Sequence, residues 1–135
     1  MTANGITLLS PDGLVASPAF SHVAVVPPGA TTIYVGGQNG VDAAGALVGD
    51  DPGEQTRRTM DNLVTALESA GAGLADVVSM TVLLKEGVDV RAAYAVAAER
   101  LADVQPPPLV TAAIVSALGV PGAAVEVGAV AAVIR

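Results

Sequence analysis

The chain has 135 residues, a length that suits one domain with a single hydrophobic core, and we predict one domain over residues 1–135. Its net charge of −7, with six Lys and Arg, argues against a nucleic-acid surface, which needs a basic stripe. The absence of cysteine excludes disulfides and thiolate chemistry. Hydrophobic residues make up 52% of the chain, but only one Phe and two Tyr are aromatic, so the core must be aliphatic.

The apolar runs of this sequence are short. None approaches the roughly 18–20 residues of a membrane span, and the first residues lack a basic segment followed by an apolar one, so no signal peptide is predicted. We therefore expect a cytoplasmic protein that has no membrane partner.

The first third of the chain predicts strands and turns. Residues 1–18 look irregular or edge-like because Pro and Gly interrupt them, and residues 20–26 and 31–37 are predicted strands. Pro27, Pro28 and Gly29 form a turn signal between the two strands, so we predict a hairpin. The glycine pair that ends the second strand indicates a close approach of its backbone to a neighbour or a ligand.

Two helices are predicted in the middle of the chain. Asp51 can cap the first helix and Pro52 suits its first position, while apolar residues follow at helical spacing until the glycines at 71 and 73 end it. Asp89 can cap a second helix over residues 90–101, which Pro106 and the prolines after it terminate. Its predicted apolar side carries Val90, Tyr94, Ala97 and Leu101.

Three further strands are predicted over residues 77–84, 109–117 and 124–134, all apolar on both faces. The predicted order is ββαβαββ, an α+β fold with two helices on one face of a mixed sheet. Because two helices cover only one face, and no other element is predicted to cover the second, we expect copies of the chain to do so in a closed homo-oligomer.

Glu126 is the one acidic residue from Gln105 to Arg135. It alternates with Val125 and Val127 in the predicted strand, so we expect it to lie on the opposite face from them. An ionised carboxylate away from water is costly unless it is paired, so Glu126 lies either at a wet edge or in a site. Arg91 is either a solvated arginine or an anion anchor. His22 is the single histidine, and without a nucleophile motif or a cluster with ligand spacing we interpret it as structural and expect neither a metal nor a cofactor.

The sequence resembles the Rid (YjgF-type) superfamily of reactive-intermediate deaminases, also known as endoribonuclease L-PSP. The matching residues keep their order and spacing from residue 17 to residue 127. They are Ser17-Pro18-Ala19-Phe20-Ser21-His22, Ile33-Tyr34-Val35-Gly36-Gly37-Gln38, Glu54-Gln55-Thr56, Met60-Asp61-Asn62-Leu63, Ala70-Gly71, Asp76-Val77-Val78, Thr81-Val82, Pro107-Pro108 and Val125-Glu126-Val127.

The resemblance implies a chorismate-mutase-like fold, a homotrimer and ligand clefts between subunits. In deaminating members, a glutamate of the last strand positions a water that attacks an imine carbon, and an arginine holds the substrate carboxylate. Glu126 matches that glutamate and is the implied catalytic residue. The implied substrate-binding positions are Phe20, Gly36, Gly37, Gln38, Arg91, Leu109, Val110 and Thr111.

Several of these positions depart from the family pattern. Phe20 stands where many members have tyrosine, Gly36 stands where serine is common, and Arg91 stands near a position often held by asparagine. The anchoring arginine belongs where this chain has Leu109 or Val110, and no arginine lies between residues 100 and 135.

These departures leave four interpretations. The first is a Rid-type homotrimer that binds or hydrolyses a small metabolite other than a standard 2-imino acid. The second is a deaminase of 2-iminobutanoate or 2-iminopropanoate, a hydrolase that uses Arg91 as the substitute anchor. The third is RNA cleavage, which the acidic charge and the few aromatics disfavour. The fourth is a purely structural or regulatory trimer.

Overall fold

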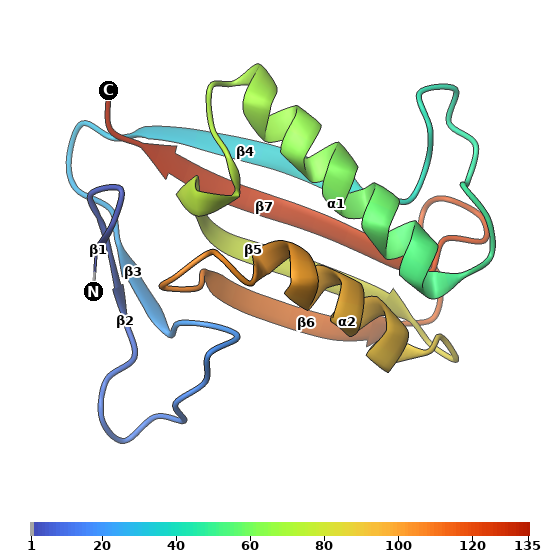
Figure 1. Ribbon diagram of the computed structural model, residues 1–135, viewed down its shortest axis with the longest axis horizontal. Helices are drawn as coiled ribbons and strands as arrows, with labels where there is room; N and C mark the ends of the chain where they lie inside the picture. The colour runs from blue at the N-terminus through green and yellow to red at the C-terminus, as the bar shows by residue number, and fades with distance from the viewer. Residues whose placement is uncertain (1) are drawn as a thin grey trace.

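The computed structural model describes residues 2–135 and has two layers, a four-stranded sheet and a pair of helices on one of its faces (Figure 1). The strand order is β4-β7-β5-β6, in which β5 and β6 run parallel and the other neighbours are antiparallel. This confirms an α+β fold with two helices on a mixed sheet. The elements of the two layers are β4 (Thr31–Gln38), α1 (Pro52–Ser69), the short 3-10 helix η1 (Leu74–Asp76), β5 (Val77–Lys85), α2 (Val90–Leu101), β6 (Leu109–Val115) and β7 (Val125–Val133).

A second, smaller sheet is formed by the beginning of the chain. Its antiparallel strands are β1 (Thr2–Ala3), β2 (Ile6–Leu9) and β3 (Val23–Val25). Residues 1–18 were predicted to be irregular or edge-like. The irregular alternative is wrong for residues 2–3 and 6–9, whereas β1 does lie at the edge of its sheet. Strands this short, broken by turn residues within a few positions, carry too few alternations to be recognised from sequence.

The predicted hairpin between residues 20–26 and 31–37 was also wrong. Thr7 of β2 lies opposite Val25 of β3, whereas Thr31 of β4 lies opposite Val133 of β7, so the two strands belong to different sheets. Pro27 and Pro28 lack the backbone N–H groups that a hairpin ladder would use, and the turn they form directs the chain from one sheet into the other.

Helix α1 begins and ends where the sequence predicts. The Glu54 backbone N–H donates to the Asp51 carboxylate at 2.9 Å, which satisfies one of the free donors of the first turn. Gly71 has a φ of 77° just after the helix, in the left-handed region that glycine adopts at little cost. The face of α1 that carries Met60, Leu63 and Leu67 is fully buried against the sheet.

Helix α2 also has the predicted bounds. The Asp89 carboxylate accepts from the N–H groups of Arg91 and Ala92 at 3.1 and 3.2 Å. Its burial is weaker than that of α1, because only Ala93 and Val96 are buried and Tyr94 is 60% exposed.

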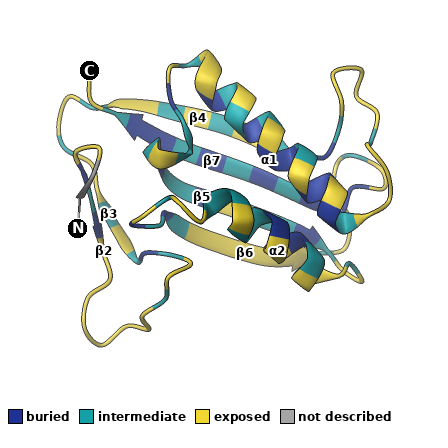
Figure 2. Ribbon diagram, viewed as in Figure 1, coloured by how far each residue is buried: buried dark blue, intermediate teal, exposed yellow. Residues whose placement is uncertain are grey.

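The two faces of the main sheet differ in how they are covered. The helices cover one face, and β7 is mostly buried while β6, at the sheet edge, is mostly exposed (Figure 2). On the other face, Ile6 and Leu8 of the small sheet pack against Ala132 at the far end of β7. We expected no element of the chain to cover this face. That expectation is wrong at the end near Ala132, which the small sheet covers. Within residues 2–135, no helix combines the length and the apolar character needed to cross a membrane.

Candidate functional site on the open face of the sheet

Glu126 lies on the face of the sheet that the helices leave uncovered. Along β7, Val125 and Val127 are buried toward the helices, so the alternation of a strand turns Glu126 and Gly128 to the opposite face. Glu126 is half-buried, and its cross-strand neighbour on β5 is Leu83. The sequence pattern predicted this alternation correctly.

A bulge in β4 makes the space that the Glu126 side chain occupies. The register between β4 and β7 shifts between Val35 and Gln38. A Cβ placed on Gly37 would lie 2.6 Å from Oε2 of Glu126, which is closer than side chains pack. The predicted site residues Gly37 and Glu126 are therefore in direct proximity, and glycine is required there for the carboxylate to lie over the strand.

The neighbouring predicted residues Gly36 and Gln38 form the rest of this bulge. A Cβ on Gly36 would meet open space, and the Gln38 amide donates to the Gly36 carbonyl at 3.2 Å. The bulge thus presents exposed backbone beside a carboxylate, an arrangement that can hold a small polar ligand.

Lys85 is a residue that sequence reasoning missed. Met80 and Leu84 of β5 are buried against the helices, so the alternation of the strand places Lys85 on the same face as Glu126. Leu83 lies opposite Glu126, which makes Lys85 a diagonal cross-strand neighbour at about 7–8 Å between backbones. The only signal in the sequence was its position at the end of a strand next to Glu86.

The structure does not bring Leu109, Val110 and Thr111 next to Glu126 within one chain. Leu109 is paired with Ser79, which is four residues before the partner of Glu126 and on a strand two positions away. Strand geometry puts Leu109 about 16 Å from Glu126. Thr111 shares the open face by its register with Thr81, whereas Val110 faces the helix side.

Arg91 and Phe20 also lie apart from Glu126. Arg91 is exposed in the first turn of α2, on the helix side of the sheet. Phe20 packs edge-on against His22 with ring centroids 5.4 Å apart. Within one chain, the predicted substitute anchor and the predicted carboxylate are therefore on opposite sides of the sheet.

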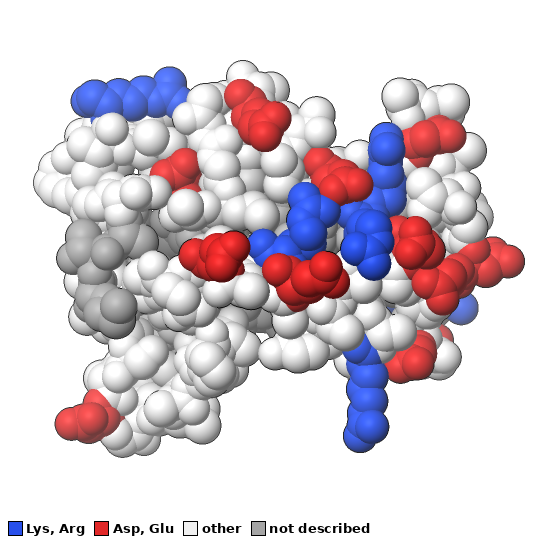
Figure 3. All heavy atoms as spheres, in the orientation of Figure 1, with Lys and Arg blue, Asp and Glu red and all other residues white. Residues whose placement is uncertain are grey.

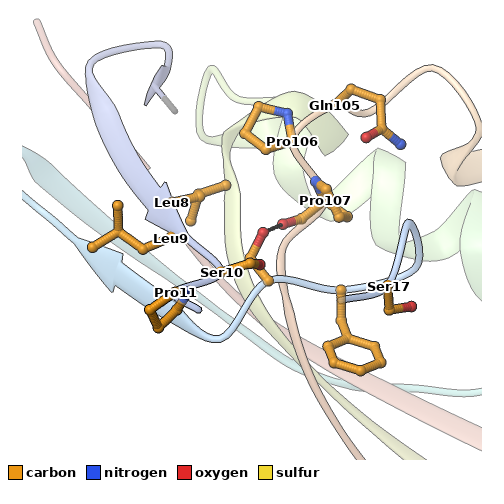
Figure 4. A pocket seen from close by; sticks show the side chains of 10 residues that line it. Leu8, Leu9, Ser10, Pro11, Ser17, Gln105, Pro106 and Pro107 are labelled. Atoms are coloured by element: carbon orange, nitrogen blue, oxygen red, sulfur yellow. Dashed lines mark hydrogen bonds between the residues drawn. The ribbon is translucent and has the colours of Figure 1, made fainter. Parts of the chain in front are cut away.

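Phe20 borders a pocket of about 470 Å³ between the small sheet and the loop that precedes β6. Figure 4 shows Leu8, Leu9, Ser10 and Pro11 on one side of it and the 105–107 segment on the other. The Ser21 hydroxyl donates to the Pro107 carbonyl at 2.6 Å, and this bond fastens the two segments together. The pocket is therefore the space left between the small sheet and the loop before β6, which this hydrogen bond joins.

His22 has a structural contact. Its Nε2–H donates to the Val15 carbonyl at 2.7 Å, since a carbonyl oxygen only accepts. This agrees with the interpretation of His22 as a structural residue. Among residues 2–135, no group of three or more acidic or histidine side chains is placed to hold a metal ion.

Three polar side chains hold the start of β7, and thereby Glu126, in place. Asn39 donates to the Val125 carbonyl at 3.0 Å, and Asn62 of α1 donates to the Asn39 carbonyl at 2.9 Å. Gln55 is 1% exposed, accepts from the Ala124 N–H at 2.7 Å, and donates to two loop carbonyls. The sequence shows that these three residues are polar, two in a helix and one at the end of a strand. It does not show which groups they bind.

The charges on the helix-bearing side are mixed. In Figure 3 acidic and basic side chains alternate across the face in view, and the described residues form no basic stripe there. On this face the charges therefore offer no basic track suited to a phosphate backbone.

A family model and two curated relatives match parts of this chain. The model of the family "Endoribonuclease L-PSP" matches residues 12–133. A RutC family protein of Pyrococcus abyssi is 47% identical over 55 residues, and one of Pyrococcus horikoshii is 35% identical over 75 residues. These matches cover 40% and 55% of this chain and span only 43% and 60% of those relatives.

Solved structures resemble the whole fold. The Rid-family protein YyfB of Yersinia pestis, described as of unknown function, has a TM-score of 0.81 and 29% identity over 93% of this chain and 97% of its own. A YjgF/YER057c/UK114 family member from Mycobacterium tuberculosis has a TM-score of 0.65 and 29% identity over 95% and 99%. The family match, the shared architecture and the ordered motifs agree, and this chain belongs to the endoribonuclease L-PSP family of the Rid/YjgF superfamily.

Proposed function

We propose that this protein binds and hydrolyses a small uncharged metabolite at a site formed between copies of the chain, with Glu126 as the group that transfers protons. The observation that carries the proposal is the placement of Glu126. It is a half-buried carboxylate on an uncovered sheet face, seated over a glycine whose missing side chain makes the space.

Two observations support a site shared between copies: the distance from Glu126 to the 109–111 segment, and the part of the sheet face that nothing in the chain covers. By strand geometry, the 109–111 segment lies about 12–16 Å from Glu126 in one chain, beyond the reach of one small ligand. The open face carries Tyr34, which is 80% exposed, and the small sheet covers only the end near Ala132. A trimer of the kind that the family resemblance implies would bring the 109–111 segment of one copy to Glu126 of another.

The chemistry that suits this site is the hydrolysis of a carbon–nitrogen double bond. Glu126 accepts a proton from water while the water oxygen bonds to the imine carbon, and the carboxyl group gives this proton to the nitrogen as the C=N double bond becomes single. Glu126 then accepts the proton of the new hydroxyl group and gives it to the nitrogen while the carbonyl double bond forms. The C–N bond breaks, and the products are a carbonyl compound and ammonia or an amine. The reaction needs no oxidant and no metal.

The substrate of this reaction is expected to lack a carboxylate. A bidentate arginine is the strongest ordinary partner for a carboxylate, and no arginine lies between residues 100 and 135. Losing such a positioning contact costs on the order of a hundredfold in rate. A neutral imine or enamine has no need of that contact.

The alternative is a deaminase of 2-imino acids that uses another cation as its anchor. Arg91 was the candidate from sequence, and it reaches Glu126 only if a neighbouring copy supplies it. Lys85 lies on the same face of the same chain as Glu126 and is the cation that favours this alternative most directly.

Two measurements test the proposal. Light scattering should report a closed oligomer, and a stable monomer would contradict a shared site. Ammonia release should be measured with 2-iminopropanoate and with an uncharged imine, using wild type and the variants Glu126→Gln, Lys85→Ala and Arg91→Ala. We expect turnover of the neutral imine that falls about 10²–10⁴-fold in Glu126→Gln.

The other outcomes select among the alternatives. Fast turnover of 2-iminopropanoate that falls in Lys85→Ala or in Arg91→Ala would establish the deaminase and identify its anchor. RNA binding that weakens steeply with salt would favour the nuclease activity that the family's name carries. An oligomer without turnover of either imine would refute the catalytic proposal and leave a structural role.

A further inference from the structure

A second cavity lies on the opposite side of the sheet from Glu126, beneath α2. Its volume is about 720 Å³, within the range of roughly 300–1,000 Å³ that is typical of small-molecule sites. The helix-facing side chains of the sheet, such as Met80, Val82 and Val110, form one wall, and α2 forms the other. It borders the smaller pocket of Figure 4 at Phe20 and Gln105.

The sequence of α2 explains why this space is open. The middle of the α2 side that faces the cavity carries Ala93, Ala97 and Ala98, whose methyl groups reach only a short distance toward the sheet. The larger side chains of Val90, Tyr94 and Leu101 border the cavity as well. On α1, the equivalent face carries leucine and methionine and is fully buried. The predicted apolar side of α2 therefore does face the sheet and borders the cavity along its length, and among its residues Leu101 also packs against the core.

Contacts with α1 hold α2 at a distance from the sheet. The Arg100 guanidinium donates to the Asp61 carboxylate, and Gly53 of α1 permits close packing against Val96 of α2. The two helices pack along each other, and α1 approaches β4 and β7 much more closely than α2 approaches the strands beneath it. The cavity cannot close by a simple descent of α2 without breaking these contacts.

The lining of the cavity selects the chemistry of its occupant. None of the described residues that border it is charged. The Thr56 hydroxyl already donates to the Pro52 carbonyl at 2.8 Å. The other polar side chains of the lining are Gln105 and Ser17, at the end shared with the smaller pocket, and Tyr94 on α2. Val90, Tyr94 and Val110 of the lining are 40%, 60% and 37% exposed, so the cavity opens to solvent at the edge of the sheet. Its apolar walls hold water poorly because polar partners are few.

We propose that this cavity binds a neutral, largely hydrocarbon molecule with one hydrogen-bonding group, such as a medium-chain alcohol. The hydrocarbon part lies between α2 and the sheet, and its polar group lies at the end that carries Gln105. A fatty-acid anion is disfavoured, because no cation borders the cavity to offset the burial of its carboxylate. This site is independent of the proposed reaction at Glu126.

The test uses N-phenyl-1-naphthylamine, a neutral dye whose emission rises when it leaves water, and competition by 1-decanol and by decanoate. Ala97→Phe places a ring in the cavity, and Ala95→Phe places the same ring on the exposed side of the same helix. We expect saturable dye binding by wild type, displacement by decanol but not by decanoate, and a loss of affinity of at least about tenfold in Ala97→Phe only.

Each other outcome overturns the proposal. Absence of saturable binding by wild type, or equal binding by the two variants, would show that the cavity takes no such ligand. A change of oligomer mass in Ala97→Phe, measured by light scattering, would show that a second copy occupies it. Circular dichroism checks folding, and if Ala97→Phe does not fold, Ala97→Leu against Ala95→Leu decides in its place.

Discussion

Replacing Gly37 by alanine perturbs the surroundings of Glu126 by a single methyl group. The φ of Gly37 lies outside the left-handed region, so the β4 backbone accepts alanine without strain. The added Cβ would lie 2.6 Å from Oε2, 2.7 Å from Cδ and 2.9 Å from Cγ of Glu126, where ordinary contact begins at 3.4 Å. The carboxylate oxygen must therefore retreat by about 0.8 Å.

This displacement should separate activity from stability. The clash involves the end of a flexible side chain, so rotation of Glu126 relieves it at a cost of about 0.5–1.5 kcal/mol in the free energy of unfolding. A shift approaching 1 Å of a reacting group lowers the rate about a hundredfold. We expect Gly37→Ala to fold nearly as stably as wild type and to lose most of its turnover of a neutral imine.

Gly36→Ala is the matched control, because its Cβ meets nothing within 4 Å. Ammonia release is measured for Gly37→Ala, and the two variants are compared by thermal melting and by the Cδ chemical shift of Glu126 in NMR, which needs no substrate. Equal effects of the two variants on the NMR signal, or an unmoved signal in Gly37→Ala, would refute the argument that the bulge shapes this site.

Three further variants test the frame around the site, each by urea unfolding. Gln55→Leu should lower the free energy of unfolding by about 2–4 kcal/mol, because three hydrogen bonds of roughly 1 kcal/mol each are lost and the Ala124 N–H stays buried; a loss below half of this would mean that water replaces the amide. Met60→Ala should cost about 2–5 kcal/mol, since Met60 is completely buried, whereas Thr65→Ala on the exposed side of α1 should change little. Asp51→Ala should cost about 1 kcal/mol through the lost N-cap, and an unchanged midpoint would show that Asp51 does not hold the first turn.

The helices were the most predictable part of the fold. Each begins at an aspartate whose carboxylate accepts backbone hydrogen bonds, so local chemistry sets where both helices start. Gly71 follows the C-cap of α1 directly, whereas α2 ends at Leu101, before Pro106 is reached. The hairpin prediction failed because a turn signal specifies only that the chain reverses. The partner of β3 is β2, whose Ile6 and Leu8 are buried against the main sheet. The turn between β3 and β4 carries no information about this pairing.

The candidate site was predictable in type and only partly in geometry. Alternation along β7 placed Glu126 on the face opposite the buried valines, as expected. The contact with Gly37 depends on a register shift, and the position of Lys85 depends on the pairing of β5 with β7, neither of which sequence periodicity contains. The distance between Leu109 and Glu126 depends on strand order, which a single sequence does not specify.

The way in which Gln55 joins three segments has a consequence for how the protein loses activity on heating. Its one amide group links the start of α1 to the carbonyls of Gly49 and Gly122 and to the N–H of Ala124, two residues before Glu126. Fraying of the first turn of α1 would therefore release the base of β7 in the same event. Inactivation should then precede the melting of the helical signal, with the amide protons of residues 123–125 exchanging as early as those at the start of α1.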